Sequence, residues 1–233
     1  MQVIENFLDK DSRETTLKKV KELKEHWLLS GDADGLIPFY TLGVARYLIG
    51  KDSQYQELFE KYNPVINENF NYLHEKIRKQ LEDVYQVEFI NYDNSSIPGF
   101  HIFENDMVFE IPLASRHVDL QYKKIDWQDI EIDVTKTLSF TLYLKLPANG
   151  GGVYYWNKYH EDFEGLTNYE REEILHKEER FYKSFNEGDL FIHNGHQFHQ
   201  IAPFFDIQDE DERISMQGHA IYSPSANKYF IHW

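Results

Sequence analysis

The stretch Leu138-Ser139-Phe140-Thr141-Leu142-Tyr143-Leu144-Lys145-Leu146 decides the fold of this chain, because apolar and polar residues alternate along it. Successive side chains of a β-strand point to opposite faces, so a period of two predicts a strand. We expect its leucine-rich face to pack outward against helices. The opposite face, with Ser139, Thr141 and Tyr143, can line an interior.

The chain around this strand changes character near residue 87. Residues 88–233 form short β-rich runs separated by turn residues, such as the glycines at 150–152. Residues 1–87 instead show apolar stripes at intervals of three and four, which predict helices. One stripe consists of Leu17, Val20, Leu23, Trp27 and Leu28; a longer one consists of Ile66, Phe70, Leu73, Ile77, Leu81 and Val84. A third helix is expected between Gly35 and Gly50.

Two charged segments interrupt the β pattern. In residues 158–186, Thr167 and Glu170 have the spacing of a capping box, so we expect a short inserted helix there. Residues 206–212 are mostly acidic and are expected to form a solvated loop. No internal repeat or low-complexity linker divides the chain. We therefore expect one α+β domain over residues 1–233, with a mainly β core and N-terminal helices packed on its major sheet.

Composition excludes several classes of protein. The 233 residues carry a formal charge of −16, which disfavours nucleic acids and anionic membranes as partners. No apolar stretch approaches the roughly 18 residues needed to cross a bilayer, and we expect a cytoplasmic protein. The absence of cysteine excludes disulfides and thiolate metal sites. The 17 Phe, 16 Tyr and 4 Trp suit a core and the wall of a ligand cavity.

The triplet His117-Val118-Asp119 is the best candidate for the start of a metal site. In a strand its first and third side chains point the same way and can bind one ion. A similar triplet at 160–162 lies in the charged insertion and is better read as a solvated loop. Three histidines compete for the distal ligand, namely His193, His196 and His199, with His219 as an outsider. We expect His193 in a strand and His196 in a turn.

Arg213 and Ser215 form a second candidate site. They share a face by the same period-two rule, and they follow the histidine-rich segment. A guanidinium fork and a hydroxyl can hold a carboxylate with two parallel hydrogen bonds. The alternatives are a surface ion pair for Arg213 and a hydrogen-bonded core histidine for His199.

In these residues the chain resembles the Fe(II)- and 2-oxoglutarate-dependent oxygenases, especially their prolyl-hydroxylase-like branch. Six pieces in the family's order carry the resemblance, over roughly residues 100–223: residues 116–119, 141–144, 150–153, 188–191, 199–203 and 213–215. The resemblance implies a double-stranded β-helix, a jelly-roll or cupin-like core. It also implies that His117, Asp119 and His199 bind Fe(II). Longer connections than in compact members leave the strand register, and with it Tyr143, open.

The resemblance further implies that Arg213 pairs with the distal carboxylate of 2-oxoglutarate, supported by Ser215 and Tyr143. Fe(II), 2-oxoglutarate and O₂ would then oxidise a C–H bond, with succinate and CO₂ as coproducts. Related halogenases lack a carboxylate where this chain has Asp119, so hydroxylation or another oxidation is favoured over halogenation.

The acceptor is less constrained by the sequence. We expect a free amino acid or a small amino-acid-derived metabolite, because no peptide- or nucleic-acid-binding module is recognisable. Hydroxylation of a peptide or protein side chain is the alternative, and a metal-binding cupin-like isomerase or sensor ranks below it. His101, Arg116 and Trp156 are candidates for substrate contact, although aromatic residues there could equally be core. The insertion at 158–186 could be a lid or a solvated connection, and the oligomeric state stays open.

Overall fold

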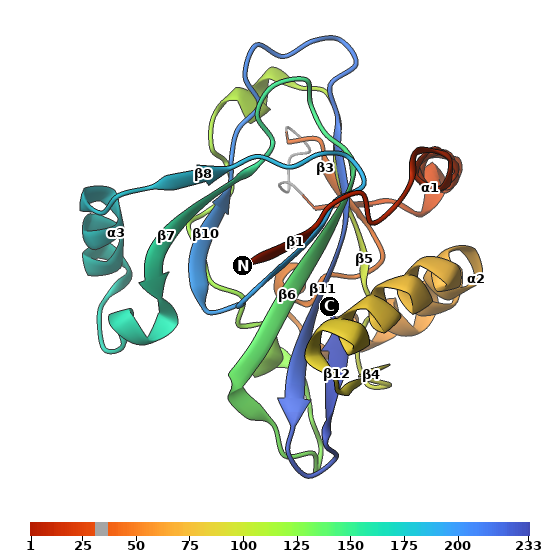
Figure 1. Cartoon of the computed structure of the whole chain (residues 1–233), viewed down its shortest axis with the longest axis vertical. Coiled ribbons are helices and arrows are strands. Elements are labelled where there is room, and N and C mark those ends of the chain that lie inside the picture. Colours follow the sequence, from red (N-terminus) through yellow and green to blue (C-terminus); the bar gives the residue numbers. More distant parts are fainter. Residues whose placement is uncertain (31–36) are drawn as a thin grey trace.

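The predicted strand is confirmed as β6 (Asp133–Lys145), which lies inside a nine-stranded sheet. The computed structural model describes residues 1–30 and 37–233 (Figure 1). It orders the sheet β1-β9-β6-β11-β5-β3-β2, with β12 paired to β11 and β4 to β12. These strands are β1 (Gln2–Ile4), β2 (Leu28–Leu29), β3 (Phe39–Leu42), β4 (Glu88–Asn91), β5 (Gly99–Phe103), β9 (Leu190–His193), β11 (Arg213–Ser223) and β12 (Lys228–His232).

A second, smaller sheet lies on the other side of the molecule from the long helices (Figure 1). It has the order β10-β7-β8, formed by β10 (Gln197–Ile201), β7 (Val153–Tyr159) and β8 (Phe181–Lys183). All its pairs are antiparallel. The fold is therefore mainly β, with three α-helices in the described part of the chain.

The two faces of β6 have the environments that the alternation predicts. Leu138, Phe140, Leu142 and Leu144 belong to the main hydrophobic core, together with residues of the N-terminal helices. On the other face, β6 pairs with β11 so that Tyr143 lies opposite Ser215 and Ser139 lies opposite His219. The polar faces of the two strands are thus side by side.

Helices α1 (Lys10–Glu22) and α2 (Asp52–Tyr85) lie against the apolar side of this sheet (Figure 1). The long predicted stripe is confirmed, since five of its six residues are buried on α2 and Val84 is partly exposed. The first stripe is helical only to Glu22. Lys24–His26 form a 3₁₀ turn after it, and Leu28 already belongs to β2, so this stripe was extended too far.

The helix expected between Gly35 and Gly50 is wrong in its described part, while Gly35 and Leu36 lie outside the described residues. Residues 37–50 contain β3 and a 3₁₀ turn at Arg46–Leu48. The aromatic and β-branched residues of β3 favour a strand, and they pair with β5, where Phe39 lies opposite Phe103. Gly43 then turns the chain at a φ of 97°. Residues 1–87 are thus not purely helical, because they also supply β1, β2 and β3.

The charged insertion contains the predicted helix, α3 (Asn168–Lys177). Thr167 and Glu170 form the capping box, in which the Thr167 backbone N–H donates to Glu170 Oε2 at 2.8 Å. The insertion also contains β8, which the sequence did not predict. The acidic segment 206–212 is mostly exposed as expected, but Asp211 is buried and accepts a hydrogen bond from the Ala148 N–H.

Further 3₁₀ turns lie at Met107–Glu110, Gln121–Lys124 and His160–Phe163. Within residues 1–30 and 37–233, none of the helices has the length and apolar character that a bilayer crossing requires.

The packing of α2 on the sheet can be tested at Phe70, which is fully buried and packs on Phe100 with ring centroids 4.6 Å apart. We expect Phe70→Ala to lower the free energy of unfolding by about 3–5 kcal/mol, because it removes a large buried ring and leaves a cavity. Urea denaturation followed by circular dichroism measures this. Glu68→Ala, on the exposed side of the same helix, should change stability by less than about 0.5 kcal/mol. Equal effects would show that α2 does not pack as described.

Candidate metal centre and carboxylate site

A cavity of about 490 Å³ lies between the two sheets. Strands β3, β5, β6, β9 and β11 of the large sheet contribute residues to its wall, as do β7 and β10 of the small one. The segment that carries His117 and Asp119 closes another side. The size suits a small ligand together with a cosubstrate.

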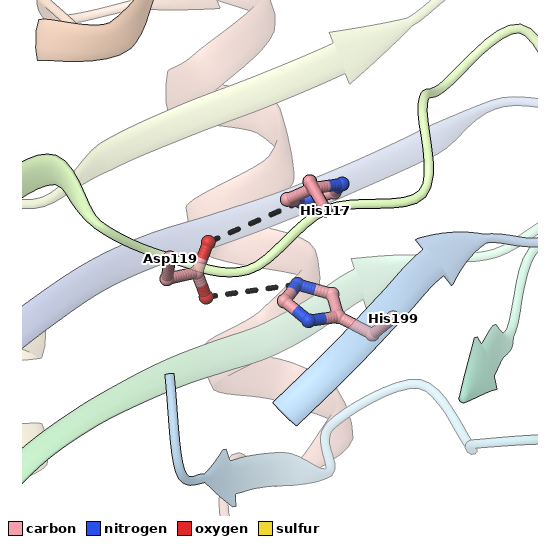
Figure 2. Close-up of side chains that lie close together, drawn as sticks. All are labelled: His117, Asp119 and His199. Carbon is pink, nitrogen blue, oxygen red and sulfur yellow. Dashed lines mark ion pairs between the residues drawn. The ribbon is translucent and has the colours of Figure 1, made fainter. Parts of the chain in front are cut away.

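His117, Asp119 and His199 come together at this cavity (Figure 2). His117 and His199 form an isolated antiparallel bridge, with backbone N–O distances of 3.0 and 2.9 Å. His117 is thus in an extended segment rather than in a regular strand, and the two-residue spacing still brings Asp119 to the same side. The Asp119 carboxylate lies 3.9 Å from His117 Nε2 and 3.6 Å from His199 Nε2. One ligand atom from each of the three residues falls within 4.8 Å of the others.

Both imidazoles are held in the orientation that a metal ligand needs. The Nδ1 of His117 donates to the Ser115 carbonyl at 2.8 Å, and that of His199 donates to the Gln197 carbonyl at 2.9 Å. Because a carbonyl only accepts, the Nε2 atoms keep their lone pairs for the side facing Asp119. Burial lowers the pKa of His117 to about 4 and also lowers the pKa of His199. Both rings are therefore neutral at pH 7.

The Asp119 carboxylate is buried and fixed by two side chains. Its Oδ2 accepts a hydrogen bond from Ser139 Oγ at 2.7 Å, and its Oδ1 accepts one from Gln121 Nε2 at 3.2 Å. Burial acts to raise the pKa of this carboxyl, but the imidazoles around it, led by that of His199, lower the pKa below its usual value. An ionised carboxylate and two neutral imidazoles are the donor set that suits Fe(II) with positions left open.

Gly195 lets the histidine-rich segment approach Asp119. Its carbonyl accepts the Asp119 backbone N–H at 2.6 Å. A Cβ atom at this position would lie 3.2 Å from Asp119 Cβ, from the Asp119 carbonyl oxygen and from Ser139 Oγ. A side chain here would press on the carboxylate and on the hydroxyl that holds it.

The competing histidines separate clearly in the structure. His193 lies in β9 and His196 in a turn, as predicted. His196 is bound elsewhere, since its Nδ1 lies 2.6 Å from Glu161 Oε1 and its Nε2 lies 3.2 Å from the Tyr122 hydroxyl. His219, expected to be an outsider, lines the cavity, and its Nδ1 lies 2.9 Å from Ser139 Oγ.

The triplet at 160–162 does not join the site. His160 begins a 3₁₀ turn, is partly exposed and contacts Lys123, which agrees with the prediction that this triplet is solvated.

Arg213 also faces the cavity and is only 1% exposed. Its Nε donates to the Gly151 carbonyl at 3.1 Å, and its Nη1 donates to Ser215 Oγ at 3.3 Å. In the described part of the chain, no carboxylate lies within 4.0 Å of this guanidinium. Gly151 adopts a φ of 66°, which only glycine accepts easily, and this conformation aims its carbonyl at Arg213. The glycine run predicted as a turn thus positions the arginine.

Tyr143 lies beside Arg213, with its ring centroid 5.4 Å from the guanidinium carbon. The residue is fully buried, and its hydroxyl interacts with the Arg213 guanidinium but has no other hydrogen-bond partner among the described residues. Burial raises the pKa of this phenol, which therefore stays protonated and able to donate. Leaving buried donors unpaired is costly. A guanidinium that has no carboxylate partner among the described residues, with a phenol hydroxyl beside it, fits a bound carboxylate.

His117, Asp119 and His199 line the same cavity as Arg213. Ser139, which contacts Asp119, and Tyr143, which contacts Arg213, are four residues apart on β6, or ~13 Å along the strand. This spacing leaves room for a short dicarboxylate that is bound at both ends.

Of the predicted substrate residues, only His101 lines the cavity. Its Nε2 lies 2.9 Å from the Tyr47 hydroxyl, and its ring packs on Phe39. Trp156 is instead buried in a small core, where its indole N–H donates to the Leu175 carbonyl of α3. It lies three residues after Val153, which lines the cavity, and therefore on the opposite face of β7.

Arg116 lies outside the cavity wall as well. Its guanidinium stacks over Trp156 at 5.6 Å and lies 3.4 Å from Glu172. Both residues therefore contact the α3 region and are not among the residues that line this cavity.

Sequence reasoning missed Gln121, Tyr47 and Lys124, all of which line the cavity. Gln121 and Lys124 lie in the 3₁₀ turn at Gln121–Lys124, and Tyr47 lies in the one at Arg46–Leu48. Such short turns leave no periodic pattern in the sequence that would predict them. Ser139 was placed on the inward face of β6 by the alternation, but its contact with Asp119 could not be foreseen.

Comparison with known proteins gives a consistent result at the level of fold. No protein-family model and no curated protein matches the chain. Among solved structures, it is similar to the non-heme alpha-ketoglutarate-dependent epimerase SnoN from nogalamycin biosynthesis, with a TM-score of 0.57, 14% identity and coverage of 95% of this chain and 79% of that one. The same epimerase is also known in complex with Fe³⁺ and alpha-ketoglutarate.

The chain is also similar to two other solved structures. A prolyl hydroxylase from Trichoplax adhaerens, in complex with a hypoxia-inducible-factor peptide, has a TM-score of 0.53 at 10% identity, with 97% and 84% of the two chains covered. An N-substituted L-amino acid dioxygenase from Burkholderia ambifaria AMMD has a TM-score of 0.51 at 12% identity, with 82% and 73% covered. The chain has the fold of the iron- and 2-oxoglutarate-dependent oxygenases. The mainly β fold with N-terminal helices, and the resemblance to these oxygenases that the sequence motifs indicated, are thereby confirmed.

The close approach at Gly195 yields a direct test. We expect Gly195→Ala to lower the free energy of unfolding by about 1–3 kcal/mol, because the added methyl group overpacks a tight contact. It should also weaken Mn²⁺ binding, measured by calorimetry, because Asp119 and Ser139 are displaced. Gly50→Ala is the matched control, since no atom lies within 4 Å of its added Cβ. Wild-type stability and Mn²⁺ affinity in Gly195→Ala would contradict the described contact.

Proposed function

We propose that this chain is an Fe(II)- and 2-oxoglutarate-dependent dioxygenase that hydroxylates a small molecule. The observation that carries the proposal is the buried Arg213 guanidinium, which has no described carboxylate partner and faces the same cavity as His117, Asp119 and His199. A metal-binding isomerase or sensor has no need of such a cation beside its metal. We further propose that the two sheets form a double-stranded β-helix.

In this proposal each end of the cavity has a separate task. His117, Asp119 and His199 would hold the iron, and Arg213, Ser215 and Tyr143 would bind the distal carboxylate of 2-oxoglutarate. When bound, iron and cosubstrate couple decarboxylation of 2-oxoglutarate by O₂ to oxidation of the substrate, with one oxygen atom entering succinate and the other the product. The fixed side chains orient the reactants, and the cavity wall limits access of water.

Asp119 bears on the type of product. Its carboxylate is buried, ionised and hydrogen-bonded by Ser139 and Gln121, so it is well placed to occupy one coordination position permanently. A halide therefore has no vacant carboxylate position to fill. This supports hydroxylation, or another oxidation, over halogenation.

The cavity supports a small acidic substrate such as an amino acid or a derivative of one. Among the described residues that line it, two are permanently cationic, the buried Arg213 and the exposed Lys124. If Arg213 binds the cosubstrate, Lys124 remains for a carboxylate of the substrate. The dioxygenase from Burkholderia ambifaria, which acts on N-substituted L-amino acids, has a similar fold.

A peptide substrate is the second candidate, and one feature of the cavity rim favours it. Met107, Ile111 and Leu113 are exposed apolar residues, and Leu113 also lines the cavity. Exposed apolar residues next to a site can contact a chain that extends beyond it. The prolyl hydroxylase from Trichoplax adhaerens, solved with a peptide, also has a similar fold.

The metal and cosubstrate sites can be tested together without knowing the substrate. Under anaerobic conditions, Fe(II) plus 2-oxoglutarate should give the weak visible charge-transfer band of the bound pair, and air should then release succinate. His199→Ala should weaken metal binding at least about tenfold and lose the band. His196→Ala should retain both, because His196 is bound to Glu161 and Tyr122. Absence of the band and of succinate in the wild-type protein would refute the oxygenase proposal.

The same experiment tests the proposed 2-oxoglutarate site at Arg213 with a separate variant. Arg213→Met should keep metal affinity and lose the band that 2-oxoglutarate induces. Lys145→Met is the matched control, because Lys145 ends β6 outside the cavity and lies 3.7 Å from Glu187. Retention of the band in Arg213→Met would place the carboxylate site elsewhere.

A screen distinguishes the two substrate classes. Amino acids, their N-substituted derivatives and proline-containing peptides are incubated with the loaded enzyme, and products that gain one oxygen atom are detected by mass spectrometry. We expect acidic small molecules to react, with Lys124→Met raising their KM at least tenfold while the KM for 2-oxoglutarate stays unchanged. The neighbouring Lys123→Met, outside the cavity wall, serves as control. Turnover of peptides alone would favour the second candidate.

A further inference from the structure

A fourth imidazole, that of His193, faces the proposed metal site. His193 is 6% exposed and lines the cavity, and its Nε2 lies 3.9 Å from Asp119 Oδ2. Its ring packs against that of His199, with centroids 4.7 Å apart. The proposed function gives this residue no role.

The ring of His193 is held in the same way as those of the two proposed histidine ligands. Its Nδ1 donates to a backbone carbonyl, that of Asn194, at 3.0 Å. His117 and His199 use the carbonyls of Ser115 and Gln197 for the same purpose. Phe191 stacks on the His193 ring with centroids 4.9 Å apart and planes at 21°, which further fixes the orientation. The Nε2 atom of His193 therefore keeps its lone pair, lies on the side of the ring near Asp119, and could bind a metal ion there.

His219 differs from His193 in the nitrogen that lies near Asp119, because that nitrogen of His219 is already hydrogen-bonded. His193, Ser139, His219 and His232 form one row across β9, β6, β11 and β12. Ser139 Oγ donates to Asp119 Oδ2, so it accepts from His219 Nδ1. His219 thus supports the carboxylate through Ser139, at a Nδ1–Oδ2 distance of 3.9 Å. The nitrogen of His193 that lies near Asp119 is Nε2, and among the described residues it has no hydrogen-bond partner.

We propose that His193 is a further metal ligand of this site, which gives three imidazoles and one carboxylate when 2-oxoglutarate is absent. The inference rests on the metal site of the proposed function and adds a residue to it. His193 lies outside the trio whose ligand atoms are within 4.8 Å of one another, so it is the ligand most easily released. Because 2-oxoglutarate would need open positions on the metal, His193 rather than a member of the trio would give up its position when 2-oxoglutarate binds.

Counting the imidazoles bound to a metal tests this directly and needs no turnover. Cu²⁺ is added to the protein, and pulsed electron paramagnetic resonance detects the remote nitrogen of each coordinated imidazole. We expect three imidazoles in the wild-type protein and two in His193→Phe, which keeps an aromatic ring to stack on Phe191. Addition of 2-oxoglutarate should reduce the wild-type count to two. The Mn²⁺ affinity of His193→Phe should fall about tenfold.

Two controls keep the outcomes separate. His196→Gln should leave the count at three, because His196 is bound to other residues. His193→Gln repeats the test with a polar side chain if His193→Phe does not fold. A wild-type count of two that His193 variants leave unchanged overturns the inference and leaves the trio intact. A count of three that persists with 2-oxoglutarate bound overturns the release of His193. Failure to bind any metal overturns the proposed function itself.

Discussion

The antiparallel pairing of β6 with β11 is the constraint on which the rest of the structure depends. Its register sets Tyr143 opposite Ser215 and Ser139 opposite His219, so both ends of the site rest on one pair of strands. The apolar faces of the same strands are buried under the N-terminal helices. A slip of one residue would exchange the two faces and would place the polar residues in the core. Burial on one side therefore enforces the geometry on the other.

The metal trio depends on a second, more local constraint, the bridge between His117 and His199. Two backbone hydrogen bonds, with a third from Asp119 to Gly195, hold the segments of the trio together without a regular strand. The side chains are then fixed by contacts with fixed backbone groups, including the carbonyls of Ser115 and Gln197. An ion bound as in the proposed function would meet side chains that are already oriented, which would reduce the ordering cost of binding.

The elements that could be predicted from the sequence are those with a strong periodic pattern of apolar residues. The alternation at 138–146 predicted both the strand and its inward face, and the stripe from Ile66 to Leu81 predicted α2. The segment around Phe39 has no such period, and its pairing with β5 comes from a partner sixty residues away. Trp156 was expected near the cavity but lies on the opposite face of β7. Which residues of β7 face the cavity depends on where the strand starts, and the sequence does not mark that point. Tyr47 and Gln121 reach the cavity from 3₁₀ turns, whose direction no local pattern encodes.

Arg213 has a consequence for the whole folded chain. A guanidinium buried without a described anion weakens the folded state, because the lost hydration is only partly replaced by Gly151 and Ser215. Any dicarboxylate that binds there stabilises the fold by RT ln(1 + [L]/Kd), about 2.7 kcal/mol at a concentration of one hundred times Kd. If 2-oxoglutarate binds there, as in the proposed function, resistance to unfolding and to proteolysis would rise with its concentration, and the lifetime of the protein would depend on the supply of its cosubstrate.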